Sequence, residues 1–360
     1  MLGNFWFKKE KPLLGLTGLG GGADSKLVGG AGGPITATGG DATYTLNSYT
    51  YHVFTSSGSL VVASGIDDVE FLVVGGGGGA GAGESTDYGR SGGGGGAGGF
   101  RCSFTGITPG GPSTSPEPGL ECNPGTYPVT IGSGGSGYTG GVGSPSNQGA
   151  DSSFGPPSTP ARIVSAGGGY GLGSRNNAGK PSAGGSGGGA SAQEQDGYPD
   201  TTYPGAPNLG GTANVANTGT NPVLGGYGGG RCASELNMGG GGGGAGAAGE
   251  DGSGPMPSPA DAGRGGDGKA VPTNMIPASY GTPGPSPGRW FSGGGYASSE
   301  NKGGTYANAG GGGANPDHWS SSSTPGSYGI DGTGGGGGGR GDSQTGGDGG
   351  DGIVILRYSA

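Results

Sequence analysis

Solid runs of glycine are the feature that most limits what this chain can fold into. Glycine supplies 105 of the 360 residues, and it comes in unbroken runs at Gly75–Gly79, Gly92–Gly96, Gly239–Gly244 and Gly334–Gly339. Glycine loses more backbone entropy on folding than any other residue, so such a chain stays disordered unless something replaces a conventional core. Collagen needs glycine strictly at every third position. The irregular spacers between these runs exclude it.

A bundle of polyglycine II helices is the ordered alternative. Such a helix has three residues per turn, rises about 3.1 Å per residue and satisfies none of its own backbone groups. Packed side by side, the chains can hydrogen-bond laterally, and without Cβ atoms their backbones can touch. We therefore expect a mainly β fold with irregular polyglycine II, in which a small β-module clamps a long bundle of packed polyglycine II helices.

The composition supports order without a large apolar core. Hydrophobic residues make up 28% of the chain and charged residues 11%, with a net charge of −9. Ordinary globular domains are close to half apolar, whereas disordered chains usually carry a high charge density. Because no basic stripe is present to neutralise phosphates, we expect no nucleic-acid binding.

Changes in composition divide the chain into three parts. Residues 1–39 form an N-terminal peptide and a flexible tether. Residues 40–74, together with 353–360, form the β-module. Residues 75–352 form the glycine-rich body, whose Pro- and Tyr-rich stretches are predicted to be loops at the ends of the bundle.

Short β-branched and aromatic runs predict the strands. Four lie in the first part of the β-module, at 43–46, 49–55, 59–63 and 69–74, separated by turn residues. Tyr49, Tyr51 and Val53 alternate with polar and aromatic neighbours, so we expect one buried face.

Three more strands are predicted outside that group. Strand-like pieces occur at 126–131 and 162–166, and Pro128 makes the first of them an edge strand at best. The chain closes with a run at 352–358, which we expect to pair with the N-terminal strands.

The sequence offers no convincing catalytic or metal-binding pattern. Of the two histidines, His52 lies in a predicted strand and His318 in a loop, and neither is placed in a catalytic triad. Matches to Gly-x-Gly-x-x-Gly arise by chance in this composition. Gly346–Gly352 is a single copy of a glycine–aspartate pattern, and its aspartates are more simply solubilising. We predict no catalytic residue, no metal and no cofactor.

Three cysteines do not make a disulfide framework. Cys102 and Cys122 bracket one loop, so both a disulfide between them and two free thiols stay open, while Cys232 is left over.

Aromatic residues in the predicted loops are the candidates for contacts with another molecule. Exposed Tyr and Trp make rigid contacts with proteins and sugars. The alternative is that they cover faces of the bundle or pack between subunits. The candidates are Tyr198, Tyr203, Trp290, Phe291, Tyr296, Tyr306, Trp319 and Tyr328.

Several ordered segments resemble the glycine-rich domain proteins of tailed phages. They are Val69–Ala80, Gly92–Gly99, Tyr127–Gly135, Asp151–Gly155 and Gly350–Tyr358. The resemblance covers roughly residues 40–360 and implies a tail-fibre or other virion protein. The glycine-rich region of the anaplastic lymphoma kinase ectodomain is similar in style, which implies a jelly-roll-like β-module interrupted by polyglycine II helices. The adhesins of some T-even phage fibres resemble it too, and residues 5–13 look like N-terminal pieces of cyanophage virion proteins.

From this resemblance we expect a structural virion protein of a bacteriophage, a tail-fibre or receptor-binding fibre subunit and not an enzyme. A mobile aromatic peptide can order on docking into a groove of a larger particle. Phe5, Trp6, Phe7, Lys8 and Lys9 are therefore predicted to anchor the subunit to other virion proteins. A capsid or tail decoration protein without receptor binding and an extracellular filament subunit stay open as alternatives.

The expected assembly is a homo-oligomer, and a trimer suits a projecting spike. The loops are expected to meet a host cell-surface glycan or protein. Residues 1–19 form neither a signal peptide nor a spanning helix, so we expect no membrane insertion and assembly of the virion in the host cytoplasm.

Overall fold

The protein is mainly β, and the strands in the described part of the chain pair antiparallel, with no helix among them. The computed structural model describes residues 34–65, 67–83, 91–113, 115–139, 146–156, 162–173, 181–191, 225–231, 239–252, 262–298, 310–313, 326–341 and 345–360.

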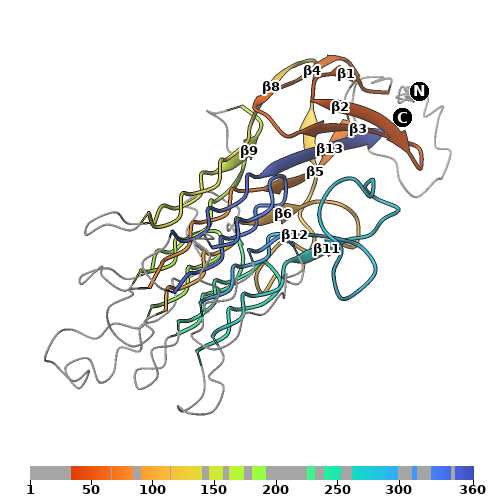
Figure 1. The fold of residues 1–360 in the computed structure, drawn as a ribbon. Helices are drawn as coiled ribbons and strands as arrows, with labels where there is room; N and C mark the ends of the chain where they lie inside the picture. The colour runs from red at the N-terminus through yellow and green to blue at the C-terminus, as the bar shows by residue number, and fades with distance from the viewer. Residues whose placement is uncertain are drawn as a thin grey trace, which may run out of the picture.

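Two sheets gather at one end of the molecule (Figure 1). One has six strands in the order β2 (Ala42–Leu46), β3 (Tyr49–Phe54), β13 (Ile353–Ser359), β5 (Asp67–Val74) and β6 (Phe100–Cys102), with β7 (Leu120–Cys122) also paired to β5. The other has five, in the order β1 (Thr36–Thr38), β4 (Gly58–Ser64), β8 (Gly125–Thr130), β9 (Ser152–Phe154) and β10 (Ile163–Ser165). A separate pair joins β11 (Lys269–Val271) to β12 (Arg289–Phe291).

The last strand lies in the middle of the six-stranded sheet. Along one edge β13 pairs with β3, and along the other it pairs with β5, so that Val354 lies between Phe54 and Val73. The predicted pairing of the chain's end with the N-terminal strands is confirmed.

Both faces of the six-stranded sheet are buried at its central strands β13 and β5. Phe71, Val354 and Leu356 face the five-stranded sheet and form one hydrophobic cluster with its side chains. Leu72 and Ile355 point the other way, into a second cluster. Strands buried on both sides need apolar residues at successive positions, which explains the continuous runs in β5 and β13. For β3 this exceeds the single buried face that its alternation predicts.

The expectation that Pro128 confines its strand to an edge is wrong. β8 lies between β4 and β9. The carbonyl of Pro128 accepts a hydrogen bond from Gly155 N at 3.0 Å, beyond the end of β9. A residue's N–H and C=O point to the same side of a strand. The missing N–H of the proline therefore faces the end of β9, where the strand pairing has stopped, and the pairing with β4 is intact.

Extended glycine segments continue from the ends of the strands and run side by side away from the sheets (Figure 1). Residues 75–83 leave from β5, residues 91–99 lead into β6, and residues 345–352 lead into β13. These segments bond to one another through backbone groups instead of side chains.

The hydrogen bonds of residues 75–83 repeat every three residues. Gly75, Gly78 and Gly81 donate to segment 93–99. Gly76 and Gly79 donate to segment 147–150, and Gly77 and Ala80 donate to segment 347–350. All three of these acceptor segments run antiparallel to 75–83. The carbonyls of 75–83 accept, with the same period, from three parallel segments, 135–138, 168–171 and 337–340. One glycine segment is thus enclosed by six neighbours.

Residues 91–99 have six neighbours as well. Their N–H groups donate to 166–172, 240–243 and 334–340, and their carbonyls accept from 75–81, 186–189 and 295–298. Segments 75–83 and 91–99 therefore lie at the centre of the packing. We call the whole set, these two segments together with the segments hydrogen-bonded around them, the glycine lattice.

The boundaries predicted from composition differ from those of the sheets. The sheets also take β1 and the five strands β6 to β10, which lie outside residues 40–74 and 353–360. Val271, Ile276 and Phe291, from and between β11 and β12, pack into the second hydrophobic cluster. This part of the predicted loop region therefore covers the six-stranded sheet.

Candidate functional site

Four of the eight predicted contact aromatics lie in described segments. The other four, Tyr198, Tyr203, Tyr306 and Trp319, fall outside them, as do the predicted anchor residues Phe5, Trp6, Phe7, Lys8 and Lys9.

Phe291 and Tyr296 are not surface contacts, which corrects the prediction for these two residues. Phe291 is fully buried in the second hydrophobic cluster. Tyr296 is 5% exposed, and its hydroxyl accepts a hydrogen bond from Arg264 Nε at 3.0 Å. Burial raises the pKa of Tyr296, against the opposing effect of Arg264. Both aromatic rings therefore pack in the interior. The sequence alone did not distinguish these buried positions from exposed loop positions.

Trp290 is half-buried and holds its own loop. Its Nε1 donates to the Ser286 carbonyl at 3.1 Å, and its ring lies so close to Gly284 that a Cβ there would overlap it. The backbone of Trp290 also exchanges hydrogen bonds with Thr282 at 2.8 and 3.0 Å.

Tyr328 remains as an exposed aromatic residue. It is 59% exposed, and Ile330 on the same short segment is 49% exposed. The segment lies within the glycine lattice, because Gly329 N donates to Asp348 O and Ile330 N donates to Gly311 O. Tyr328 and Ile330 therefore offer apolar surface on a rigid backbone.

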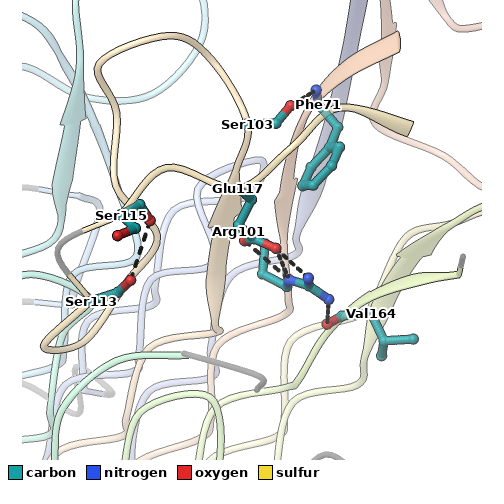
Figure 2. Close-up of polar contacts among 7 residues, drawn as sticks. All are labelled: Phe71, Arg101, Ser103, Ser113, Ser115, Glu117 and Val164. Atoms are coloured by element: carbon teal, nitrogen blue, oxygen red, sulfur yellow. Dashed lines mark hydrogen bonds and ion pairs between the residues drawn. The ribbon is translucent and has the colours of Figure 1, made fainter. Parts of the chain in front are cut away.

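Arg101 and Glu117 form a buried ion pair that ties a loop to both sheets (Figure 2). Arg101, on β6, is 2% exposed, and its Nε lies 3.0 Å from a Glu117 carboxylate oxygen. Its Nη1 donates to the carbonyl of Val164 on β10 at 3.2 Å. Nearby, the Ser103 hydroxyl accepts from Phe71 N at 2.7 Å. The pair thus links the six-stranded sheet, the five-stranded sheet and the loop between β6 and β7.

A second buried arginine lies on the other face of the six-stranded sheet. Arg357 Nε lies 2.6 Å from Glu70 Oε2, and its Nη1 donates to the Tyr51 hydroxyl at 3.0 Å. Its guanidinium stacks over the rings of Tyr49 and Phe104, at 4.4 and 4.1 Å from their centroids. Burial disfavours its charge, but Tyr51 and Glu70 outweigh that effect and raise the pKa of Arg357.

Aspartates complete the hydrogen bonding at the rim of the glycine lattice. Asp351 Oδ1 accepts from Gly134 N at 2.8 Å, and Asp348 Oδ1 accepts from Gly137 N at 2.7 Å. The two aspartates and the two amides are each three residues apart, which is the period of the lattice. Their carboxylates therefore occupy the place that a neighbouring chain takes in the interior.

The same device recurs elsewhere on the rim. Asp151 Oδ1 accepts from Gly167 N at 2.9 Å, and Asp251 Oδ1 accepts from Arg231 N at 2.6 Å. Sequence reasoning assigned the aspartates of 346–352 only a solubilising role. Their spacing of three residues was the signal that would have revealed this one.

The question of a disulfide is settled for two cysteines. Cys102 and Cys122 are free thiols. Cys102 belongs to the second hydrophobic cluster and Cys122 to the first, on opposite faces of the six-stranded sheet. Burial raises the pKa of both thiols, that of Cys122 to about 12.

Within the described segments, no group of three or more His, Cys, Asp or Glu side chains is arranged to hold a metal ion. No described helix has the length and apolar character needed to cross a membrane.

Comparison with known proteins identifies the family. No curated protein matches the chain. The glycine-rich domain family matches residues 53–359, which include every strand from β4 to β13 and the whole glycine lattice. The chain therefore belongs to the glycine-rich domain family.

Proposed function

We propose that this chain is a structural virion protein of a bacteriophage, a fibre subunit that attaches through its N-terminal peptide. In this proposal, a jelly-roll-like β-sandwich clamps a rod of packed polyglycine II helices. The observation that carries it is the enclosure of residues 75–83 by six hydrogen-bonded neighbours with a period of three.

A period of three supports the polyglycine II assignment. With three residues per turn, successive N–H groups point in three directions around the axis, and a residue three positions later points the same way. The N–H groups of Gly75, Gly76 and Gly77 reach three different segments, and that of Gly78 returns to the first. A two-residue strand period would reach only two neighbours.

The direction of the segments supports a projecting role. Gly75 follows directly from β5, whereas Gly83, at the far end of its segment, bonds to Arg340 O. The segment that ends at Gly341 leads away from the sheets. The segment that begins at Thr345 leads back toward them. Such a rod suits the presentation of material at a distance from an attachment point. The exposed Tyr328 and Ile330 lie along its side.

Deletion of residues 1–11 tests the attachment. The truncated protein should keep the melting temperature of the full chain but be missing from purified particles. Replacing Phe5, Trp6 and Phe7 by serine should have the same effect. Replacing only Lys8 and Lys9 by glutamine should reduce incorporation into particles less. Normal incorporation of the deleted chain would contradict attachment through this peptide.

Loop exchange tests receptor binding. The exchanged residues should be confined to 192–224, 299–309 and 314–325, because Phe291 and Tyr296 belong to the interior. A receptor-binding fibre predicts a changed host range with unchanged incorporation. An unchanged host range would favour a decoration protein. Open polymers without DNA-filled heads would favour an extracellular filament.

A further inference from the structure

His52 joins three parts of the β-sandwich that are far apart in the sequence. It is 1% exposed and lies on β3. Its Nδ1 lies 2.7 Å from the Gly39 carbonyl and 3.4 Å from the Thr43 hydroxyl. Its Nε2 lies 3.2 Å from the hydroxyl of Tyr358 on β13, and the two rings stack at 5.7 Å.

These contacts define the tautomer of the neutral ring. A carbonyl oxygen only accepts hydrogen bonds, so Nδ1 carries the proton that is donated to Gly39. Nε2 must then accept from the Tyr358 hydroxyl. Ala37 on β1 packs against the hydrophobic cluster that contains Tyr358. The segment 37–39 is therefore held by His52 at Gly39 and by this cluster at Ala37.

Residues 39 and 40 carry the chain from one sheet to the other. Both are glycines with positive φ, +122° and +88°, and a Cβ at Gly39 would overlap the Ser59 carbonyl. Asp41 fastens the far side of this crossing, because its carboxylate accepts hydrogen bonds from Thr55 N at 2.7 Å and Ser56 N at 2.9 Å. On the near side β1 is only three residues long, lies at a sheet edge and has an irregular register with β4.

Protonation would place a positive charge on His52 in a buried site. Nε2 would become a donor, and the Tyr358 hydroxyl would have to turn from donor to acceptor. None of the described carboxylates contacts the ring, and Tyr358 is the titratable group that faces it. An uncompensated charge in a buried site is costly. Burial accordingly lowers the pKa of His52 below its ordinary value of 6.5, although the Gly39 carbonyl acts in the other direction.

We propose that His52 is a pH-sensitive latch on the N-terminal segment, and that its protonation releases residues 34–40, up to the point that Asp41 holds, while the rest of the sandwich stays closed. Of the three parts that meet at His52, this segment has the shortest strand pairing, because β1 has three residues and lies at a sheet edge. Residues 1–33 precede it in the chain. The latch therefore controls how firmly the N-terminal peptide is held to the β-sandwich.

The sign of the effect follows from linkage. A histidine with a lowered pKa contributes stability that is present above the pKa of the released state, about 6.5, and is lost as the pH falls through the lower pKa of the latched state. Each unit of pKa difference makes release about tenfold more favourable in acid. Asp41 does not interfere, because burial is outweighed by its hydrogen bonds and its pKa lies below 3.8.

Hydrogen exchange on the full-length protein between pH 8 and pH 5 tests the latch. After correction for the intrinsic rate of exchange, peptides covering 34–40 should lose protection in acid. Peptides from β5 and β13 should keep theirs. Exchange in 34–40 that does not depend on pH, or equal loss in all three regions, would overturn the proposal.

Two variants and a titration complete the test. His52→Gln should abolish the pH dependence of 34–40, and the same dependence in this variant would contradict the latch. His318→Gln is the matched control and leaves His52 as the sole histidine for an NMR titration. The midpoint of that titration should coincide with the loss of protection. A clear mismatch would overturn the proposal even where His52→Gln fails to fold.

Discussion

At the scale of single residues, the glycine lattice leaves no room for a Cβ at most of its positions. A methyl group at Gly78 would overlap the Gly169 carbonyl, and one at Gly95 would overlap the Gly78 carbonyl. The obstacles are backbone atoms that are themselves hydrogen-bonded on several sides, so they cannot move aside cheaply. Ala80 and Ala97 are fully buried in the same segments, which limits a tolerated methyl to particular positions.

We predict that Gly78→Ala lowers the free energy of unfolding by about 3 kcal/mol or more, because the added methyl overpacks rigid backbone. Gly125→Ala is the matched control. There a Cβ would meet its nearest atom at 3.8 Å, an ordinary contact. Denaturant unfolding of both variants measures the difference. Equal stability of the two would show that the lattice yields to side chains.

Thiol chemistry gives a second prediction at this scale. In a Cys232→Ser variant, Cys102 and Cys122 should not react with a thiol reagent at pH 8 in the folded protein, because burial excludes the reagent and raises both pKa values. Both should react promptly in denaturant. Rapid reaction of either thiol in the native state would contradict the placement of these residues in the two hydrophobic clusters.

At the scale of elements, aspartate side chains at the rim of the glycine lattice take the place of a neighbouring chain as hydrogen-bond acceptors. Asp348 accepts from Gly137 N and Asp351 accepts from Gly134 N, across 211 and 217 residues of sequence. A buried or half-buried N–H without a partner costs about 1–3 kcal/mol. The carboxylates therefore close the lattice on this side.

We predict that Asp348→Ala combined with Asp351→Ala destabilises the protein by about 2–5 kcal/mol, since two amides lose their acceptors. In this variant the rate of amide exchange should increase more at Gly134 and Gly137 than at Gly78. The Asn double variant keeps an acceptor oxygen at both sites and should lose less. Identical effects of Ala and Asn would show that the contribution comes from charge alone.

The elements differ in how far the sequence predicts them. β2 to β5, β8, β10 and β13 have runs of β-branched and aromatic residues, and they were predicted within a few residues of their positions. β1, β6, β7, β9, β11 and β12 have three residues each, too few for a periodic signal. Their strand conformation depends on partners that only the fold brings together. β10 is equally short and was predicted from its adjacent β-branched residues Ile163 and Val164.

The candidate contacts show the same limit. Phe291 and Tyr328 are both aromatic residues in glycine-rich surroundings, yet one is fully buried and the other is 59% exposed. Local sequence does not distinguish them, because burial of Phe291 depends on β11 and β12 covering the six-stranded sheet. The aspartates of the rim likewise depend on which glycine segment lies opposite.

At the scale of the whole molecule, the chain closes on itself through β13. This strand contributes Val354 and Leu356 to one hydrophobic cluster and Ile353 and Ile355 to the other. It also carries Arg357, which pairs with Glu70. Along the chain, the glycine lattice begins directly after β5 and ends directly before β13.

We predict that removal of residues 353–360 prevents folding of both the sheets and the lattice. Burial of four such side chains contributes roughly 10 kcal/mol, about the total stability of a typical domain. Circular dichroism and sedimentation check the state of the truncated chain, and a synthetic peptide of 352–360 added in trans should restore part of the native signal. The deletion of residues 1–11 serves as the control of similar size. A truncated chain with the native melting temperature would contradict the central role of β13.

The hydrogen bonds between glycine segments have a mechanical consequence. They lie across the length of the segments, so a pull along that length loads all the bonds of a segment in shear at once. Unzipping, which breaks bonds one after another, would require a pull from the side. Residues 75–83 share their load with six neighbours. We therefore expect the projection to resist axial tension far better than lateral peeling, with the sheets yielding before the glycine segments slide.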